Sequence, residues 1–197
     1  MKFIKKENDN FQKIAKTGLL VLTSAFFAAC SSDDDSIPEI INEEELITTM
    51  KVSLVPENGG ETLVLNFQDL DGDGSNEPII DSEILAANTI YSGTILLLNE
   101  TTDPAENSTL EVAEEGEAHQ FFYSNNAGMI TNYTDEDSNG NPIGINFSLE
   151  TSAATSGSLT IILRHEPNKS AEGVTDGNIE NAGGETDILV TFPITVE

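Results

Sequence analysis

The chain has 197 residues and a formal net charge of −27, because 35 aspartates and glutamates outnumber 8 lysines and arginines. A chain this acidic cannot neutralise phosphates, which excludes nucleic acid as a partner, and an anionic membrane surface would repel it. The single cysteine excludes a disulfide within the chain.

The first thirty residues have the layout of a lipoprotein signal peptide. Five lysines precede an apolar run over residues 18–29, as a charged n-region precedes an h-region. The run is shorter than the roughly 20 residues that a membrane-spanning helix needs. The sequence FAAC, which ends at Cys30, resembles a bacterial lipobox. We therefore expect residues 1–29 to be removed and Cys30 to carry lipid, the alternative being an incidental or buried thiol.

Residues 30–45 are predicted to form an acidic tether. The sequence SSDDD begins directly after Cys30 and resembles the surface-export signal of lipoproteins from Bacteroidota, although short acidic runs also occur in solvated tails. Lipid on a lipobox cysteine comprises two or more acyl chains, which is enough for stable anchoring. We expect a lipid-anchored protein of the outer membrane, displayed at the cell surface, that meets the membrane only through its lipid.

Residues 46–197 are predicted to form one β domain, because apolar and polar side chains alternate with period two. The expected strands cover residues 46–54, 62–68, 89–98, 119–124, 129–134, 145–150, 159–164 and 187–196. In the last strand, Asp187 falls on the face opposite Ile188. Pro193 lies in the same strand and cannot donate to a ladder, so this strand is expected to be an edge or to carry a bulge.

These strands predict the fold class. Seven to nine short strands, separated by turns rich in Gly, Asn and Asp and without helical spacing anywhere, are typical of an all-β, antiparallel β-sandwich of immunoglobulin-like size. An open barrel is the alternative.

Several segments of the predicted domain resemble those of small flavobacterial lipoproteins, some of which are labelled type 1 periplasmic binding fold superfamily proteins. The segments are DLDGDGSNEP (69–78), LAANTIYSGTILLLNE (85–100), HQFFY (119–123), SNGNPIG (138–144), RHEPNK (164–169) and NAGGETD (181–187). The resemblance implies an exported lipoprotein and no particular activity or site. The label implies a two-lobed α/β protein, but this chain is too short and lacks alternating strand and helix patterns.

The acidic sequence DLDGDG at residues 69–74 predicts a calcium loop. Its aspartates match positions one, three and five of an EF-hand loop, with Gly at six, although the glutamate of position twelve is missing. The predicted ligands are Asp69, Asp71, Asp73, Ser75, Glu77 and Asp81. Three carboxylates so close together repel one another unless a cation lies among them. An Asp-Gly turn between strands is the equally weighted alternative.

A second acidic loop, DEDSNG at residues 135–140, offers a weaker calcium pattern. Its candidate ligands are Asp135, Asp137 and Asn139. The same sequence contains Asn-Gly, the strongest short signal for a hairpin turn. We therefore favour a hairpin over a calcium site here.

His119 and His165 are the only histidines, and each lies on a predicted strand. If the two strands are neighbours, two imidazoles and a nearby carboxylate could hold a transition metal. The alternative is that each histidine is simply hydrogen-bonded or paired with an acid.

Sequence signatures of enzymes are absent: there is no G-x-S-x-G, no H-E-x-x-H and no phosphate-binding glycine loop. We expect a non-catalytic binding or structural module, stabilised by calcium. The alternative is a lipoprotein that binds a small ligand or a transition metal through His119 and His165, and a hydrolase is a distant third. A protein or glycan partner is compatible with this sequence but is not identified by it.

Overall fold

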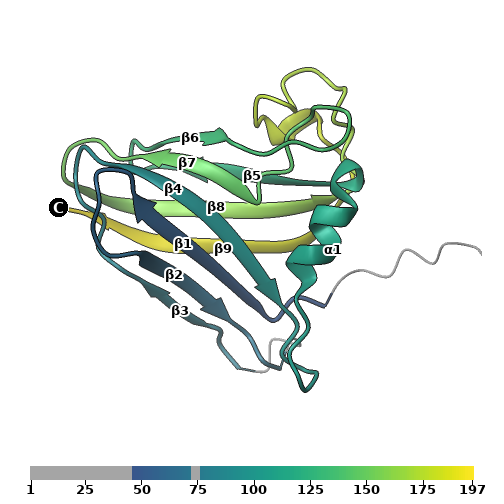
Figure 1. The fold of residues 1–197 in the computed structure, drawn as a ribbon, viewed down its shortest axis with the longest axis horizontal. Coiled ribbons are helices and arrows are strands. Elements are labelled where there is room, and N and C mark those ends of the chain that lie inside the picture. The colour runs from purple at the N-terminus through teal and green to yellow at the C-terminus, as the bar shows by residue number, and fades with distance from the viewer. Residues whose placement is uncertain (1–45, 72–75) are drawn as a thin grey trace, which may run out of the picture. The chain divides into compact units, whose positions relative to one another are not determined.

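The computed structural model describes residues 46–71 and 76–197. In these residues, nine β-strands form two antiparallel sheets that share one hydrophobic core (Figure 1). The prediction of an all-β sandwich is confirmed. The predicted signal peptide, Cys30 and the tether lie outside the described residues.

The larger sheet has six strands in the order β3-β2-β1-β4-β7-β6. Its strands are β1 (Thr49–Pro56), β2 (Leu63–Gln68), β3 (Ile79–Ser82), β4 (Ile90–Leu98), β6 (Ile130–Tyr133) and β7 (Asn146–Glu150). The smaller sheet has three strands in the order β5-β8-β9. They are β5 (His119–Asn125), β8 (Thr155–His165) and β9 (Glu185–Val196). Three short helices complete the described structure, namely α1 (Ser108–Glu114), η1 (Gly116–Ala118) and η2 (Ile179–Asn181).

The core lies between the sheets, where alternate residues of each strand point inward. Met50 and Val52 of β1 and Phe192 of β9 are buried there. Gly93 of β4 is required by the packing, because a Cβ at this position would lie 2.4 Å from the ring of Phe147 on the neighbouring strand. A side chain at residue 93 would therefore displace one of the largest rings in the core.

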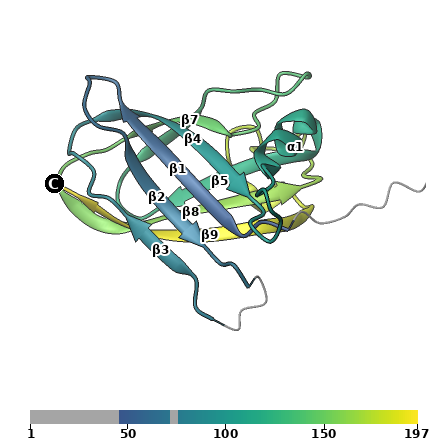
Figure 2. The same ribbon diagram turned by 60° about the horizontal axis from the view of Figure 1, so that its bottom comes forward.

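One edge of the sandwich is joined by main-chain bonds between the sheets. The segment after β3 runs beside the end of β9, where Leu85 pairs with Val196 in parallel orientation. Leu85 N donates to Thr195 O at 2.9 Å, and Glu197 N donates to Leu85 O at 2.9 Å. Figure 2 shows β3 close to β9 at this edge. The sandwich is therefore partly closed on one side, a step towards the barrel considered as the alternative.

The strand β3 and the helix α1 are among the elements that were not expected from the sequence. The strand β3 carries Ile79 and Ile80, both exposed, so it lacks the alternation that marks a half-buried strand. The helix α1 lies in a stretch expected to be a polar loop. It has only 7 residues, its buried residues are Ser108 and Val112, and the Asn107 side chain caps its first turn. Two turns with so few apolar positions leave no helical periodicity to detect.

The outer face of the smaller sheet is covered by the connection between β8 and β9. Phe122, Val174 and Ala182 form a second small core there, and Ile162 and Ile179 pack against it. This connection fixes the ends of β8 and β9 relative to each other. Within residues 46–71 and 76–197, no helix has the length and apolar character to span a membrane.

Candidate metal centre

The two histidines are brought together by strand pairing. The strands β5 and β8 are antiparallel neighbours, and His119 and His165 are direct cross-strand partners. Their ring centroids are 4.6 Å apart. Phe121 and Leu163, two residues away on each strand, share this face and lie in the core. The histidines therefore point into one end of the sandwich interior, as the metal hypothesis requires.

A third ligand candidate, Asp187, comes from the neighbouring strand β9. Leu163 pairs with Ile188 but Arg164 pairs with Thr186, so Asp187 is an extra residue opposite this step. Such a β-bulge re-aims a side chain. The Asp187 carboxylate is fully buried, 3.9 Å from His119 Nε2 and 3.8 Å from His165 Nδ1.

Sequence reasoning missed Asp187. Regular alternation places it on the face opposite Ile188, but the bulge turns it towards the histidines. The acidic residues near the histidines in the sequence, Glu117 and Glu166, are not members of this group. Nothing in the strand's period-two pattern signals the bulge.

Hydrogen bonding determines which ring nitrogen of His119 carries the proton. Its Nδ1 lies 3.1 Å from Glu115 O, and because a carbonyl only accepts, Nδ1 carries the proton. Burial lowers the pKa of His119 below its ordinary value, an effect that the hydrogen bond to Glu115 only partly offsets. The ring is therefore neutral near pH 7, with the Nε2 lone pair directed at the cluster. A backbone carbonyl on the other ring nitrogen is a common way of orienting a metal-binding histidine.

The cluster contains buried nitrogen atoms without hydrogen bonds. His119 Nε2 and His165 Nδ1 are both buried, and neither makes a hydrogen bond. Buried polar atoms are nearly always satisfied, so such exceptions point to a functional role or an unseen ion. One ligand atom from each of His119, His165 and Asp187 lies within 4.8 Å of the others.

These distances are wider than those around a bound metal. Metal–nitrogen bonds of about 2.0 to 2.1 Å in a tetrahedron place ligand atoms roughly 3.3 Å apart. The histidine–aspartate separations of 3.8 and 3.9 Å would need to close by about half an ångström, and the widest separation among the three ligand atoms, which lie within 4.8 Å of one another, by up to about 1.5 Å. Two imidazole nitrogens and one carboxylate oxygen suit zinc or ferrous iron and leave coordination positions open.

A hollow lies beside His165, one of the three ligand residues. It has a volume of about 450 Å³ and is lined by His165, Glu166, Gly184 and Glu185. The His165 side chain is 9% exposed, whereas those of His119 and Asp187 are 0% exposed. An ion that comes from solvent would therefore meet His165 before the other two ligand residues.

The backbone around this hollow is unusual. Glu166 has a φ of +50°, a left-handed conformation that is rare outside glycine. Gly184 has a φ of +67°, and a Cβ there would lie 2.1 Å from His165 O. Such strain costs on the order of 1 to 3 kcal/mol and concentrates at functional sites. The close contact with Gly184 holds the His165 backbone in place.

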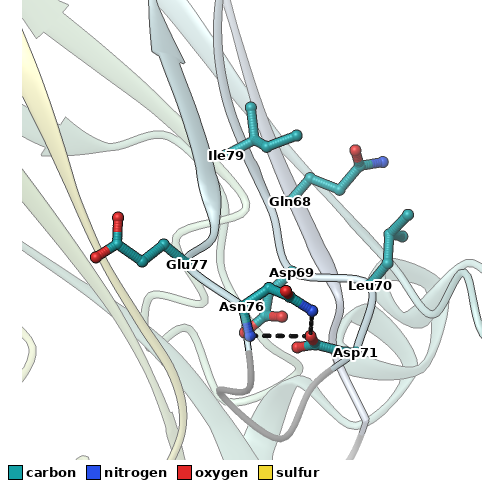
Figure 3. A pocket seen from close by; sticks show the side chains of 7 residues that line it. All are labelled: Gln68, Asp69, Leu70, Asp71, Asn76, Glu77 and Ile79. Carbon is teal, nitrogen blue, oxygen red and sulfur yellow. Dashed lines mark hydrogen bonds between the residues drawn. The ribbon is translucent and has the colours of Figure 1, made fainter.

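The first predicted calcium loop is described only in part, because Asp73 and Ser75 lie outside the described residues. Asp69 and Asp71 line a hollow of about 290 Å³ together with Glu77 (Figure 3). Asp71 accepts hydrogen bonds from Asn76 N, at 3.1 Å, and from the Asn76 side chain. Figure 3 shows Glu77 pointing away from the two aspartates, and Asp81 lies in β3 opposite Asn66. Calcium binding here stays a prediction.

The second acidic loop is a hairpin turn whose carboxylates are already engaged. Glu136 pairs with Pro142 across the turn. Asp135 accepts from the amides of Gly144 and Asn146, and Asp137 accepts from those of Asn139 and Asn141. Lys169 Nζ lies 2.9 Å from Asp137 Oδ2. Calcium binding at Asp135, Asp137 and Asn139 stays a prediction, in a loop whose carboxylates already accept these hydrogen bonds.

Comparisons with protein families, with curated proteins and with solved structures found no match for this chain. The resemblance to flavobacterial lipoproteins and the expected export therefore stay predictions.

Proposed function

We propose that this chain is a lipid-anchored exported protein that binds a divalent transition-metal ion through His119, His165 and Asp187. The observation that carries the proposal is the convergence of three buried donors in which both imidazole nitrogens, Nε2 of His119 and Nδ1 of His165, lack a hydrogen bond. A neutral His119 beside a carboxylate supplies a lone pair and a negative charge, which is the combination that a cation satisfies.

The competing explanation is an ion cluster in which protonated histidines flank Asp187. The two explanations differ in what they predict for His119. An imidazolium would need its proton on Nε2 as well as on Nδ1, yet burial lowers the pKa of His119 and so disfavours the charged ring. A metal ion requires the neutral ring that this environment favours.

The proposed role is binding without a catalytic step, outside the cell or in the periplasm. The location follows from the signal peptide and Cys30 predicted from the sequence. Incorporation of labelled fatty acid into the parent chain but not into the Cys30→Ala variant tests the anchor, and equal labelling of both would contradict it. Calcium binding at residues 69–81 is a separate proposal, because its ligands and those of the His119 centre have no residue in common.

Isothermal titration of the full chain in detergent, after chelator treatment, tests the metal proposal. We expect one zinc ion per chain, and we expect Asp187→Asn and His119→Gln each to weaken binding by about 10- to 100-fold or more. Asp176→Asn, which removes an exposed aspartate elsewhere, is the matched control and should bind as the parent does. Excess calcium should not displace the zinc, because imidazole nitrogens are poor calcium ligands. Equal zinc binding by the parent and the Asp187→Asn variant would refute the proposal.

A further inference from the structure

We infer that the metal enters and leaves the folded protein through the hollow at His165, with Glu166 and Glu185 as transient ligands that pass the ion to the buried donors. This inference depends on the metal binding proposed above and assigns a role to two residues outside the ligand set.

The three ligand side chains differ in their exposure to solvent. Of the three ligand side chains, those of His119 and Asp187 are completely buried and that of His165 is 9% exposed. The hollow of about 450 Å³ has His165 in its lining. An ion coming from solvent therefore meets the His165 ring first, and rotation of that ring opens the path to the other two donors.

Glu166 and Glu185 lie next to His165 in the fold. Glu166 directly follows His165 in the chain, and Glu185 is the cross-strand partner of His165. Side chains of directly paired residues share a face, with Cβ atoms about 4.5 to 5.5 Å apart. Both glutamates are exposed, and both line the hollow. Two residues with carboxylate side chains therefore line the same hollow as His165.

The backbone segments that carry Glu166 and Glu185 pack closely together. Glu166 adopts its left-handed conformation directly after His165, and Gly184 immediately precedes Glu185. A Cβ on Gly184 would lie 2.8 Å from Glu166 O, so the two backbone segments are in close contact. The geometry brings the chain segments that carry the glutamates together at the mouth of the hollow.

The chemistry of the entering species follows from the charge. Two carboxylates in a hollow concentrate cations and repel anions, and such focusing raises association rates by about 10- to 1,000-fold. The centre should therefore accept a hydrated metal cation and reject the same metal in an anionic chelate. Oxygen ligands bound for a short time replace water from the ion stepwise before the imidazoles capture it.

Stopped-flow zinc loading of the chelator-treated full chain, followed with a fluorescent zinc indicator, tests the inference. The Glu166→Gln/Glu185→Gln variant should load and release zinc about tenfold more slowly, with a Kd within about threefold of the parent, because a transient ligand speeds both directions. The matched control is Glu57→Gln/Glu61→Gln. It removes the same charge from the β1–β2 turn, at the end of the larger sheet opposite α1 (Figure 1), and should load as the parent does.

Each other outcome counts against the inference. Equal loading rates in the parent and the Glu166→Gln/Glu185→Gln variant would show that the two glutamates take no part. Equal slowing in both double variants would mean that only net charge matters, and a Kd raised tenfold or more would make the glutamates permanent ligands. Failure of the parent chain to bind zinc at all would instead refute the proposed function itself.

Discussion

Replacing Lys169 by Met should destabilise the fold strongly, because Lys169 is a buried cation with every proton in use. Its Nζ donates to Gly116 O at 2.5 Å, Asp137 Oδ2 at 2.9 Å and Pro142 O at 3.0 Å. The side chains of Lys169 and Asp137 are 6% and 1% exposed. Methionine keeps most of the length of the stem but leaves the carboxylate and two carbonyls without this donor.

The expected magnitude follows from the charge that is left behind. Breaking a buried ion pair by removing one partner costs about 3 to 5 kcal/mol. The Asn139 and Asn141 amides still donate to Asp137 at 2.9 and 3.0 Å, so we expect the lower half of that range, about 3 to 4 kcal/mol. For a domain of this size, that loss lowers Tm by roughly 6 to 16 °C.

The assay is thermal and urea unfolding of the full chain in detergent, followed by circular dichroism. Lys51→Met is the matched control, because Lys51 is a partly exposed lysine on β1, and it should change stability by less than about 1 kcal/mol. The double variant Lys169→Met/Asp137→Asn should recover part of the loss, since the orphaned charge is gone. A loss below about 1 kcal/mol for Lys169→Met, the level of an exposed pair, would refute the reasoning.

The pair of Lys169 and Asp137 also predicts a pH dependence. Burial raises the pKa of Asp137, but hydrogen bonds from Lys169 and from the Asn141 and Asn139 amides outweigh it, so the pKa is lowered. The stabilisation that the ionised Asp137 supplies is therefore complete above the unfolded pKa of about 3.9 and is lost as the pH falls through the lowered pKa of the folded chain. The free energy of unfolding of the parent and Asp137→Asn chains, measured between pH 7 and pH 3, should therefore differ less at the acid end of this range. A difference that stays constant would contradict this prediction. Gly184→Ala should lower the free energy of unfolding by more than about 2 kcal/mol, because the new Cβ would lie 2.1 Å from His165 O. Gly183→Ala is the control, since Gly183 has a φ of +60° and open space around it, and should lower it by about 1 kcal/mol. Similar melting temperatures for the two variants would refute the clash. Calcium at 10 mM should raise the free energy of unfolding by roughly 1.4 to 2.7 kcal/mol if residues 69–81 bind it with a Kd of about 10⁻⁴ to 10⁻³ M. In a thermal melt, the Asp71→Asn/Asp73→Asn variant should not show this calcium-dependent rise in stability. An equal effect of magnesium on the parent chain would contradict specific calcium binding and favour a simple turn.

Much of the fold was predictable because it depends on local alternation. The strands around Val52, Phe147 and Ile161 bury every second side chain against one core, and this pattern is present in the sequence itself. Pro193 indicated an edge strand, and β9 is the outer strand of the smaller sheet. The strand β3 and the helix α1 escaped detection because their few apolar residues follow neither period.

The candidate site was predictable only in part, because it depends on pairing and on one irregularity. The sequence offered His119 and His165 as a pair if their strands were neighbours, and the register of β5 with β8 meets this condition. Asp187 joins them through a bulge that period-two reasoning cannot anticipate. Likewise, the cation that pairs with Asp137 is the ammonium of Lys169, 32 residues further along the chain, a distance at which sequence spacing carries no information.

Two buried polar clusters in this domain differ in a way that bears on the metal. In the first cluster the cation is the Lys169 ammonium, which donates hydrogen bonds to three acceptors. Around Asp187 two imidazole rings lie beside a buried carboxylate, and His119 Nε2 and His165 Nδ1 make no hydrogen bond. The first cluster therefore contains an ammonium group, whereas the second contains imidazole nitrogens that can bind a metal ion.

The histidine cluster combines three irregular features, namely a bulge at Asp187, a left-handed Glu166 and a glycine at residue 184 that its neighbours require. Departures from regular structure are tolerated where they serve a function and are otherwise removed because they cost stability. Their concentration within a few residues of His165 is what a site built for an external cation would require, and it distinguishes this end of the smaller sheet from the regular strands elsewhere in the described domain.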